Sequence, residues 1–257
     1  MSTKSGVHRE VYPNAKEAVA HVAKEIAALI RSKESEGKKC VLGLATGASP
    51  VQLYEELVRL HKEEGLSFKN VISFNLDEYL PMERESVHSY WYFMHHHLFD
   101  HIDIDPSNVH IPDGRLKEDQ IPAFCEKYEQ EIKAAGGIDL QILGIGRTGH
   151  IGFNEPGSTL QSKTRQVNLS ELTLKDAAPE FGGFENVPTK AITMGVGTVM
   201  SARRIVLLAW GEKKAPIIKK AIEGPISDAI PASFLQEHPN CIFILDTSAA
   251  SELTPLK

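Results

Sequence analysis

The chain has few cysteines and no long apolar run. Its three cysteines, Cys40, Cys125 and Cys241, are too few and too far apart for a disulfide framework or a site of thiolate metal ligands. Nowhere do roughly 18 apolar residues follow one another, which argues against a membrane-spanning helix. The first residues have no apolar core of the kind that a signal peptide needs. We therefore expect a cytoplasmic protein with buried, inert cysteines and no membrane partner.

Positive charge is also in short supply. The sequence has 28 lysine and arginine residues against 34 aspartate and glutamate residues, a net charge of -6, and its lysines are scattered. A nucleic-acid groove needs a clustered basic face that neutralises phosphates, so we expect small-molecule partners and no nucleic acid. No linker or internal repeat divides the chain, which predicts a single domain over residues 1–257.

Strand-like and helix-like segments alternate along the chain. A helical stripe begins at Ala15, with Asn14 and Glu17 as its capping pair. Most of the strand-like runs have almost no polar alternation, which is typical of parallel strands buried on both faces. The sequence therefore predicts a doubly wound, mostly parallel Rossmann-like α/β fold, with ligands at the carboxyl ends of the strands. The expected strands are residues 40–45, 71–76, 140–145, 191–196, 205–210 and 241–245, and the further expected helices are residues 49–64, 86–101, 120–135 and 212–223.

The loop Thr46-Gly47-Ala48-Ser49, after the first expected strand, is typical of an anion site. The sequence predicts a helix capped by Ser49, with Pro50 at its first position and Gln52 completing a capping box. The amino terminus of a helix presents free N–H groups and a partial positive charge. The Gly-Lys-Ser/Thr ending of a nucleotide loop is absent, so we expect one phosphate on a small molecule; a capped turn without a ligand is the alternative.

Two adjacent carboxylates, Asp77 and Glu78, follow the second expected strand. Neighbouring residues of an extended chain point to opposite sides, so one of the two is expected to face a site. Burial against aromatic residues would raise the pKa of that carboxyl into the range of a general base. A solvated acidic turn is the alternative interpretation.

A third loop, Gly144 to Pro156, spaces its first three glycines as in a dinucleotide-binding turn. The residues that follow show no helical stripe, which argues against that function. His150 and Glu155 in this loop can exchange protons with a substrate. Their spacing does not match a helical metal motif, so we expect no metal there.

Two further features invite a functional interpretation. On a helix, His95, His96 and His97 would point in three directions, so they cannot converge on one ion. Lys213 and Lys214 begin a helix directly after a strand, where a cation would reach a bound phosphate; a solvated lysine pair is the alternative.

Taken together and in this order, four segments resemble the glucosamine-6-phosphate deaminase (isomerase) family over nearly the full length of the chain. The resemblance implies conversion of glucosamine 6-phosphate and water to fructose 6-phosphate and ammonia in amino-sugar catabolism, with no metal or organic cofactor. The matching segments are Leu42 to Pro50, Phe74 to Tyr79, Gly149 to Pro156 and Gly195 to Thr198.

The resemblance also implies the roles of individual residues. His150, assisted by Glu155, opens the sugar ring, and Asp77 carries a proton from C2 to C1 through an enolamine. The positions that match or adjoin the family's phosphate-binding residues are Thr46, Gly47, Ala48, Ser49 and Lys214.

Several positions depart from the family pattern. Thr148 stands where many members carry an aspartate, so we expect a weaker effect on the pKa of the His150 imidazole, and slower or differently pH-dependent ring opening. Residues 177–180 offer no phosphate-gripping arginine near position 179. Ser158 and Arg165 match an allosteric site of the regulated members, whereas Val167 replaces their lysine; this argues against activation by N-acetylglucosamine 6-phosphate.

Two other functions stay open. 6-Phosphogluconolactonases are similar in fold and in their Gly-His loop, but tend to show Asp-Glu-Arg where this chain has Asp77-Glu78-Tyr79. A non-catalytic sugar-phosphate sensor is compatible with Thr148, although the presence of Asp77, His150 and Glu155 together argues against it. A homo-oligomer also stays open, as does membership in a longer protein.

Overall fold

A seven-stranded sheet runs through the middle of the molecule, and each neighbouring pair of its strands is parallel. The structure, a computed structural model, describes residues 7–255. The strand order is β1-β10-β9-β6-β2-β3-β5, which confirms the predicted doubly wound fold. The strands of this sheet are β1 (His8–Tyr12), β2 (Cys40–Leu44), β3 (Val71–Asn75), β5 (Val109–His110), β6 (Leu140–Leu143), β9 (Arg204–Ala209) and β10 (Cys241–Asp246).

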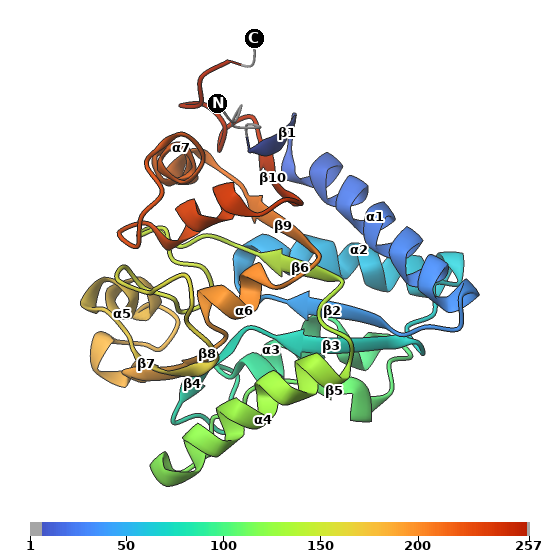
Figure 1. Cartoon of the computed structure of the whole chain (residues 1–257), viewed down its shortest axis with the longest axis horizontal. Helices are drawn as coiled ribbons and strands as arrows, with labels where there is room; N and C mark the ends of the chain where they lie inside the picture. The colour runs from blue at the N-terminus through green and yellow to red at the C-terminus, as the bar shows by residue number, and fades with distance from the viewer. Residues whose placement is uncertain (1–6, 256–257) are drawn as a thin grey trace.

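Helices cover both faces of this sheet, as Figure 1 shows. The helices α1 and α2 lie in crossovers that lead toward the β5 edge of the sheet, whereas α4, α6 and α7 lie in crossovers that lead back toward β1. Because such crossovers are right-handed, the two groups of helices cover opposite faces. The helices are α1 (Ala15–Ser35), α2 (Ala48–Glu64), α3 (Tyr90–His97), α4 (Ile121–Ala134), α5 (Glu171–Ala177), α6 (Val196–Met200) and α7 (Ala215–Glu223).

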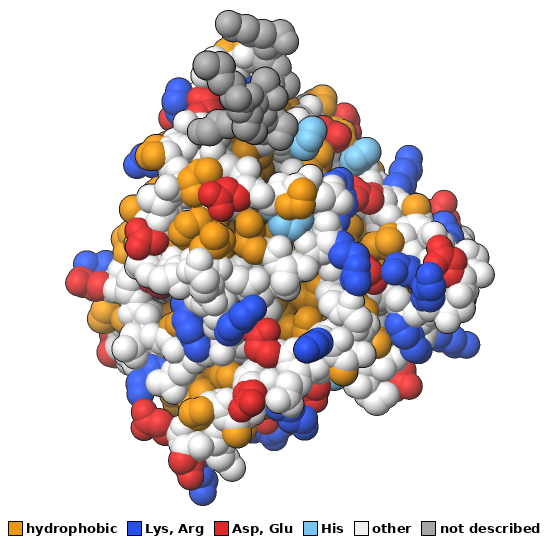
Figure 2. Space-filling model, viewed as in Figure 1, with side chains coloured by type: hydrophobic (Ala, Val, Ile, Leu, Met, Phe, Trp, Pro, Cys, Tyr) orange, Lys and Arg blue, Asp and Glu red, His pale blue; other side chains and the backbone are white. Residues whose placement is uncertain are grey.

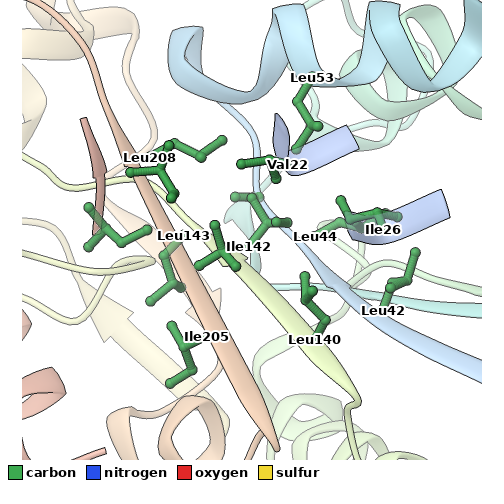
Figure 3. Close-up of a cluster of buried hydrophobic side chains, with 14 of the residues drawn as sticks. Val22, Ile26, Leu42, Leu44, Leu53, Leu140, Ile142, Leu143, Ile205 and Leu208 are labelled. Carbon is green, nitrogen blue, oxygen red and sulfur yellow. The ribbon is translucent and has the colours of Figure 1, made fainter. Parts of the chain in front are cut away.

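One part of the core lies between α1 and the central strands. The Asn14 side chain accepts a hydrogen bond from the Glu17 backbone N–H at 2.9 Å, which confirms the capping pair. The apolar stripe of α1 then meets β2, so that Val22 and Ile26 lie against Leu44, as Figure 3 shows. Each such side chain contributes roughly 1.5–3 kcal/mol on burial, which is why the stripe fixes the orientation of the helix.

A second, antiparallel sheet corrects one expectation. The segment 191–196 is expected in the main sheet, but its residues 191–193 belong to the middle strand of a three-stranded sheet of order β4-β8-β7, and Val196 begins α6. An apolar run shows that a strand is buried, but it does not show which sheet buries it. The strands are β4 (Asp77–Leu80), β7 (Arg165–Asn168) and β8 (Lys190–Thr193).

Leu76 links the two sheets. Its N–H donates to the carbonyl of Leu44 at the end of β2 (3.0 Å), and its carbonyl accepts from the N–H of Met194, just after β8 (2.7 Å). The chain therefore passes from β3 into β4 at a point fixed to both sheets.

The expected helix at 86–101 is also shorter than predicted. The helix α3 begins at Tyr90 because the side chain of Ser89 accepts a hydrogen bond from the N–H of Tyr92 at 2.9 Å. It ends at His97 and is followed by a short 3-10 turn over Phe99–His101. The segment expected as one helix therefore contains two elements, α3 and the 3-10 turn.

The surface and the cysteines agree with the composition. Acidic and basic side chains are interspersed over the face shown in Figure 2. No helix among residues 7–255 is long and apolar enough to cross a membrane. The three cysteines are free and buried, and burial raises the pKa of the Cys125 thiol to about 11, which suppresses its reactive thiolate form.

Candidate functional site

The cavity that the predicted site residues line, called the main cavity below, opens where the order of strands reverses. From β2 the chain continues outward to β3, whereas β6 on its other side continues to β9, so the loops after β2 and β6 diverge and leave a crevice. A cavity of about 510 Å³ occupies this place. Its walls include Ala45, Thr46, Gly47, Ala48, Ser49, Gln52, Leu76, Asp77, Tyr90, Gly144, Ile145, Gly146, His150, Gly152, Phe153, Trp210 and Lys214.

The loop after β2 forms one wall. Gly47 directly precedes α2. Its φ of +98° is a backbone conformation that glycine adopts without strain. The predicted cap by Ser49 is wrong: Ser49 lies within the first turn, and its carbonyl accepts a hydrogen bond from Trp210 Nε1 at 3.0 Å. Within residues 7–255 no side chain accepts a hydrogen bond at this cap. The first N–H groups of α2 are therefore available to an anion in the cavity.

Lys214 supplies a cation to the same cavity. It ends a short 3-10 turn (Glu212–Lys214) that leads into α7, and its Nζ donates to the carbonyl of Ile145 at 2.6 Å. Burial lowers the pKa of Lys214, while its neighbour Lys213 is exposed. The two lysines therefore differ in environment, and Lys214 is the one that lines the cavity.

Asp77 begins β4 and is 6% exposed at the cavity wall. Burial first, and then the charge of Glu78, raise the pKa of the Asp77 carboxyl well above its ordinary value. Such a carboxyl has the proton affinity that a general base needs near neutral pH. Glu78 turns the other way and is absent from the cavity wall, which confirms that adjacent carboxylates point in different directions.

His150 enters the cavity from the loop after β6. Its Nδ1 lies 3.0 Å from the Thr148 hydroxyl and 3.4 Å from Glu155 Oε1. Burial lowers the pKa of the His150 imidazole, whereas the charge of Glu155 raises it; Lys214 lowers it and Asp176 raises it to a smaller extent. The imidazole is thus a neutral group at neutral pH that a nearby carboxylate helps to protonate.

Two hydrogen bonds orient the Glu155 carboxylate. Its Oε2 accepts from the N–H of Ser170 at 2.9 Å, and its Oε1 accepts from the hydroxyl of Thr173 at 2.7 Å. Both donors lie at the start of α5. The short helix α5 therefore fixes the carboxylate that acts on His150.

Two glycines let these groups approach one another. A Cβ on Gly146 would stand only 2.0 to 2.3 Å from three atoms of the His150 ring. Gly152 has a φ of +56°, and a Cβ at this position would lie 2.9 Å from Thr193 Oγ1 and 3.4 Å from Asp77 Oδ2. The histidine loop can therefore pack directly against the strand that carries Asp77.

Comparison with known proteins gives a family for this arrangement. A family model described as glucosamine-6-phosphate isomerases/6-phosphogluconolactonase matches residues 13–243. The chain belongs to this family. Its relatives include a glucosamine-6-phosphate deaminase of Shewanella loihica, which is 50% identical over 91% of this chain and 87% of its own length. Another, from Thermoanaerobacter pseudethanolicus, is 47% identical over 90% of each chain.

One relative in the family is much longer. A glucosamine-6-phosphate deaminase-like protein of Bacteroides thetaiotaomicron is 48% identical over 96% of this chain, but the match covers 37% of that protein. The chain thus spans about a third of the length of this relative, and most of the length of the other two.

Solved structures show the same fold. A structure described as a monomeric glucosamine-6-phosphate deaminase is 41% identical to this chain, with a TM-score of 0.90 over 95% of this chain and 99% of that one. The 6-phosphogluconolactonase from Trypanosoma brucei is 21% identical, with a TM-score of 0.77 over 96% of this chain and 99% of that one. The second likeness shows the fold alone.

Arg165 and Ser158, which are expected from the family resemblance to match allosteric positions, contact each other. Arg165 Nη1 donates to Asn154 Oδ1 at 2.9 Å, and its Nη2 donates to Ser158 Oγ at 3.2 Å. Neither Arg165 nor Ser158 lines the main cavity. Their contacts brace the end of the histidine loop against β7.

The three consecutive histidines do not converge. His95 stacks on Trp91, His96 on Tyr92, and the ring of His97 lies 4.4 Å from that of Phe93. Each ring follows its own neighbour on the preceding turn, as side chains on successive helical residues must. Among residues 7–255 no group of three or more His, Cys, Asp or Glu side chains is placed to bind a metal ion.

Sequence reasoning missed several cavity residues. Tyr90, Trp210 and Gln52 are not among the residues expected at the site, yet all three line the cavity. Trp210 directly follows β9, so the rule that ligands gather at strand ends would have found it. Gln52 lies one turn into α2, on the cavity side, whereas Tyr90 reaches the site through tertiary packing that no local signal predicts.

Proposed function

We propose that this protein converts glucosamine 6-phosphate and water to fructose 6-phosphate and ammonia. The observation that carries the proposal is the arrangement around one cavity of an anion-binding helix start, a lysine, a buried carboxyl of raised pKa and a histidine with its carboxylate. The deaminases at 47 to 50% identity support the choice of substrate. Loops of both sheets contribute, which supports our expectation that the chain works as one domain.

Phosphate binding comes first in the proposed reaction. The N–H groups at the start of α2, around Thr46 to Ser49, and the ammonium of Lys214 bind the sugar phosphate. These groups attract the two negative charges of the phosphate without a metal. The rest of the sugar then extends toward Asp77 and His150.

Ring opening is the proposed work of His150. The imidazole takes the proton of the anomeric hydroxyl and returns it to the ring oxygen, so that the C1–O5 bond breaks and an aldehyde forms at C1. Glu155, 3.4 Å away, stabilises the imidazolium that forms between the two transfers. Thr148 adds a hydrogen bond but no charge, so most of this stabilisation depends on Glu155.

Asp77 performs the isomerisation in this proposal. The carboxylate removes the proton from C2, which is acidic because it lies next to the aldehyde, and the electrons form the C1–C2 double bond. The aldehyde oxygen takes a proton from the ammonium group of the substrate, which gives the enolamine. Asp77 returns the proton to C1 and leaves an imine at C2. Water adds to this imine, ammonia leaves, and the C2 ketone of fructose 6-phosphate remains.

The test is release of both products from glucosamine 6-phosphate, measured across pH. We expect equal amounts of ammonia and fructose 6-phosphate, and a loss of about 10²- to 10⁴-fold in kcat for Asp77→Asn. Asp103→Asn is the control, because the Asp103 carboxylate accepts a hydrogen bond from the N–H of Phe68 at 2.6 Å and does not line the cavity.

Each other outcome points elsewhere. Hydrolysis of 6-phosphogluconolactone without deamination would replace the proposal by the lactonase function. Saturable binding of glucosamine 6-phosphate without turnover would replace it by a sugar-phosphate sensor.

A further inference from the structure

Glu78 is a buried carboxylate that the proposed reaction does not use. It is 2% exposed and lies on β4 beside Asp77, with its side chain turned away from the cavity. Burial of a carboxylate is costly unless strong donors satisfy it. The buried carboxylate of Glu78 therefore depends on its hydrogen-bond donors.

The donors to Glu78 come mainly from the start of α3. Tyr90 N–H lies 2.9 Å from Glu78 Oε2 and 3.1 Å from Oε1, and Trp91 N–H donates to Oε2 at 3.1 Å. The N–H of Tyr79 donates to Oε1 at 2.9 Å. The next N–H of the helix, that of Tyr92, donates to the Ser89 hydroxyl, so the first turn of α3 is fully capped. Glu78 connects this turn to β4.

This turn carries a cavity residue. The side chain of Tyr90 lines the same cavity as Asp77, with its ring 5.0 Å from that of Tyr79 and 6.0 Å from that of Phe153. The backbone of Tyr90 is thus fixed by Glu78, while the residue lines the cavity. A shift of the turn would move the ring directly into or away from the cavity.

We propose that Glu78 is a positioning residue for this reaction, which fixes the first turn of α3 to β4 and so sets the place of Tyr90 beside Asp77. This inference rests on the proposed function, because it concerns the rate of that reaction. The contacts between Glu78 and α3 do not depend on that function. The adjacency of Glu78 to Asp77 in sequence gives it a second influence, through charge.

The charges around Glu78 define that influence. Burial raises the pKa of Glu78 to about 7, against the lowering effect of its three N–H donors, and Asp113 raises it slightly. Asp113 is itself paired with Arg115 at 3.0 Å and Arg84 at 3.6 Å, which limits its effect. The charge of Glu78 in turn raises the pKa of Asp77.

Two phenols, those of Tyr79 and Tyr90, lie close to this carboxylate pair. Burial raises the pKa of Tyr79 to about 12, and it raises that of Tyr90 well above its ordinary value. Both phenols are therefore neutral at neutral pH. As pH rises, the carboxyl with the N–H donors ionises first, and its charge delays the ionisation of Asp77.

Two variants separate position from charge. Glu78→Gln keeps the shape but places an amide N–H₂ where a carboxylate oxygen accepted, and it removes the charge. We expect kcat to fall about 10-fold with little change in KM, and the acid limb of kcat/KM to move down by roughly one pH unit. Glu78→Asp keeps the charge on a shorter side chain, so we expect kcat to fall while the acid limb stays within a few tenths of its wild-type pH.

Glu129→Gln is the matched control. Glu129 accepts hydrogen bonds from the N–H and hydroxyl of Thr164, each at 2.8 Å, and does not line the main cavity. We expect this variant to lose stability without a shift of the pH profile. A folded Glu78→Gln protein with wild-type kcat and acid limb would overturn the inference. If that variant does not fold, an unchanged kcat for Glu78→Asp would do the same.

A readout without turnover distinguishes this inference from the proposed function. The titration of Asp77, followed by carbon-13 NMR of its carboxyl, is expected to move to lower pH in Glu78→Gln. That shift would support the arrangement even if the wild-type protein releases no ammonia, and its absence would count against the arrangement even if deamination is efficient.

Discussion

Thr148 gives the sharpest prediction about proton transfer. Its hydroxyl is 3.0 Å from His150 Nδ1, so Thr148→Asp would place a carboxylate about 4 Å or less from the imidazole. At an effective dielectric constant of about 20, two charges 4 Å apart interact by about 4 kcal/mol, which limits the rise in the pKa of His150 to about three units. Because Glu155 already acts on the same nitrogen, we expect a rise of about one to two units.

The assay for Thr148→Asp has two parts. NMR titration of His150 is expected to show a higher pKa than in the wild type, because the added charge favours the imidazolium. The limb of kcat/KM that reports His150 is expected to move to higher pH by the same amount. Thr148→Asn, which has the shape of aspartate without the charge, is the matched control. If the titrations of the two variants coincide, the electrostatic reasoning about this loop is wrong.

Two other substitutions test the cavity walls. Gly146→Ala is expected to lower kcat/KM by at least about 100-fold, because its methyl group would occupy the space of the His150 ring; a folded variant with wild-type kcat/KM would refute this. Lys214→Met is expected to raise KM for glucosamine 6-phosphate about 10- to 100-fold through loss of a charged hydrogen bond, whereas Lys213→Met, in the exposed neighbour, should leave KM unchanged. Equal effects of the two lysine substitutions would argue against a specific phosphate contact.

Much of the architecture was predictable because its determinants are local. Apolar runs such as that of β2 are buried along their whole length, and turn residues bound them. The rule that ligands bind at strand ends then predicts that Thr46, Asp77, His150 and Lys214 lie near one another, and all four line one cavity. Each of these side chains leaves a strand end of one of the sheets or the loop that follows it.

The remainder depended on contacts between distant segments. Four strands, β1, β4, β5 and β7, were not predicted, because each is short and lacks the apolar run that predicted the other six. The cap of α2 was misplaced because Ser49 satisfies the sequence preference for a cap, whereas its position against Trp210 is decided by tertiary packing. The contacts of Glu78 with α3 join residues 12 and 13 positions apart, beyond the reach of any periodic pattern.

The double attachment of Leu76 has a consequence for which carbon atom reacts. The proposed phosphate-binding loop follows β2 in the large sheet, whereas Asp77 begins the small sheet, and Leu76 fixes the two at one separation through Leu44 and Met194. A sugar phosphate anchored at one end therefore presents to Asp77 the carbon whose distance from the phosphorus matches that separation. In this arrangement the distance between the phosphate and Asp77, which the backbone sets where the two sheets meet, selects C2 over its neighbours.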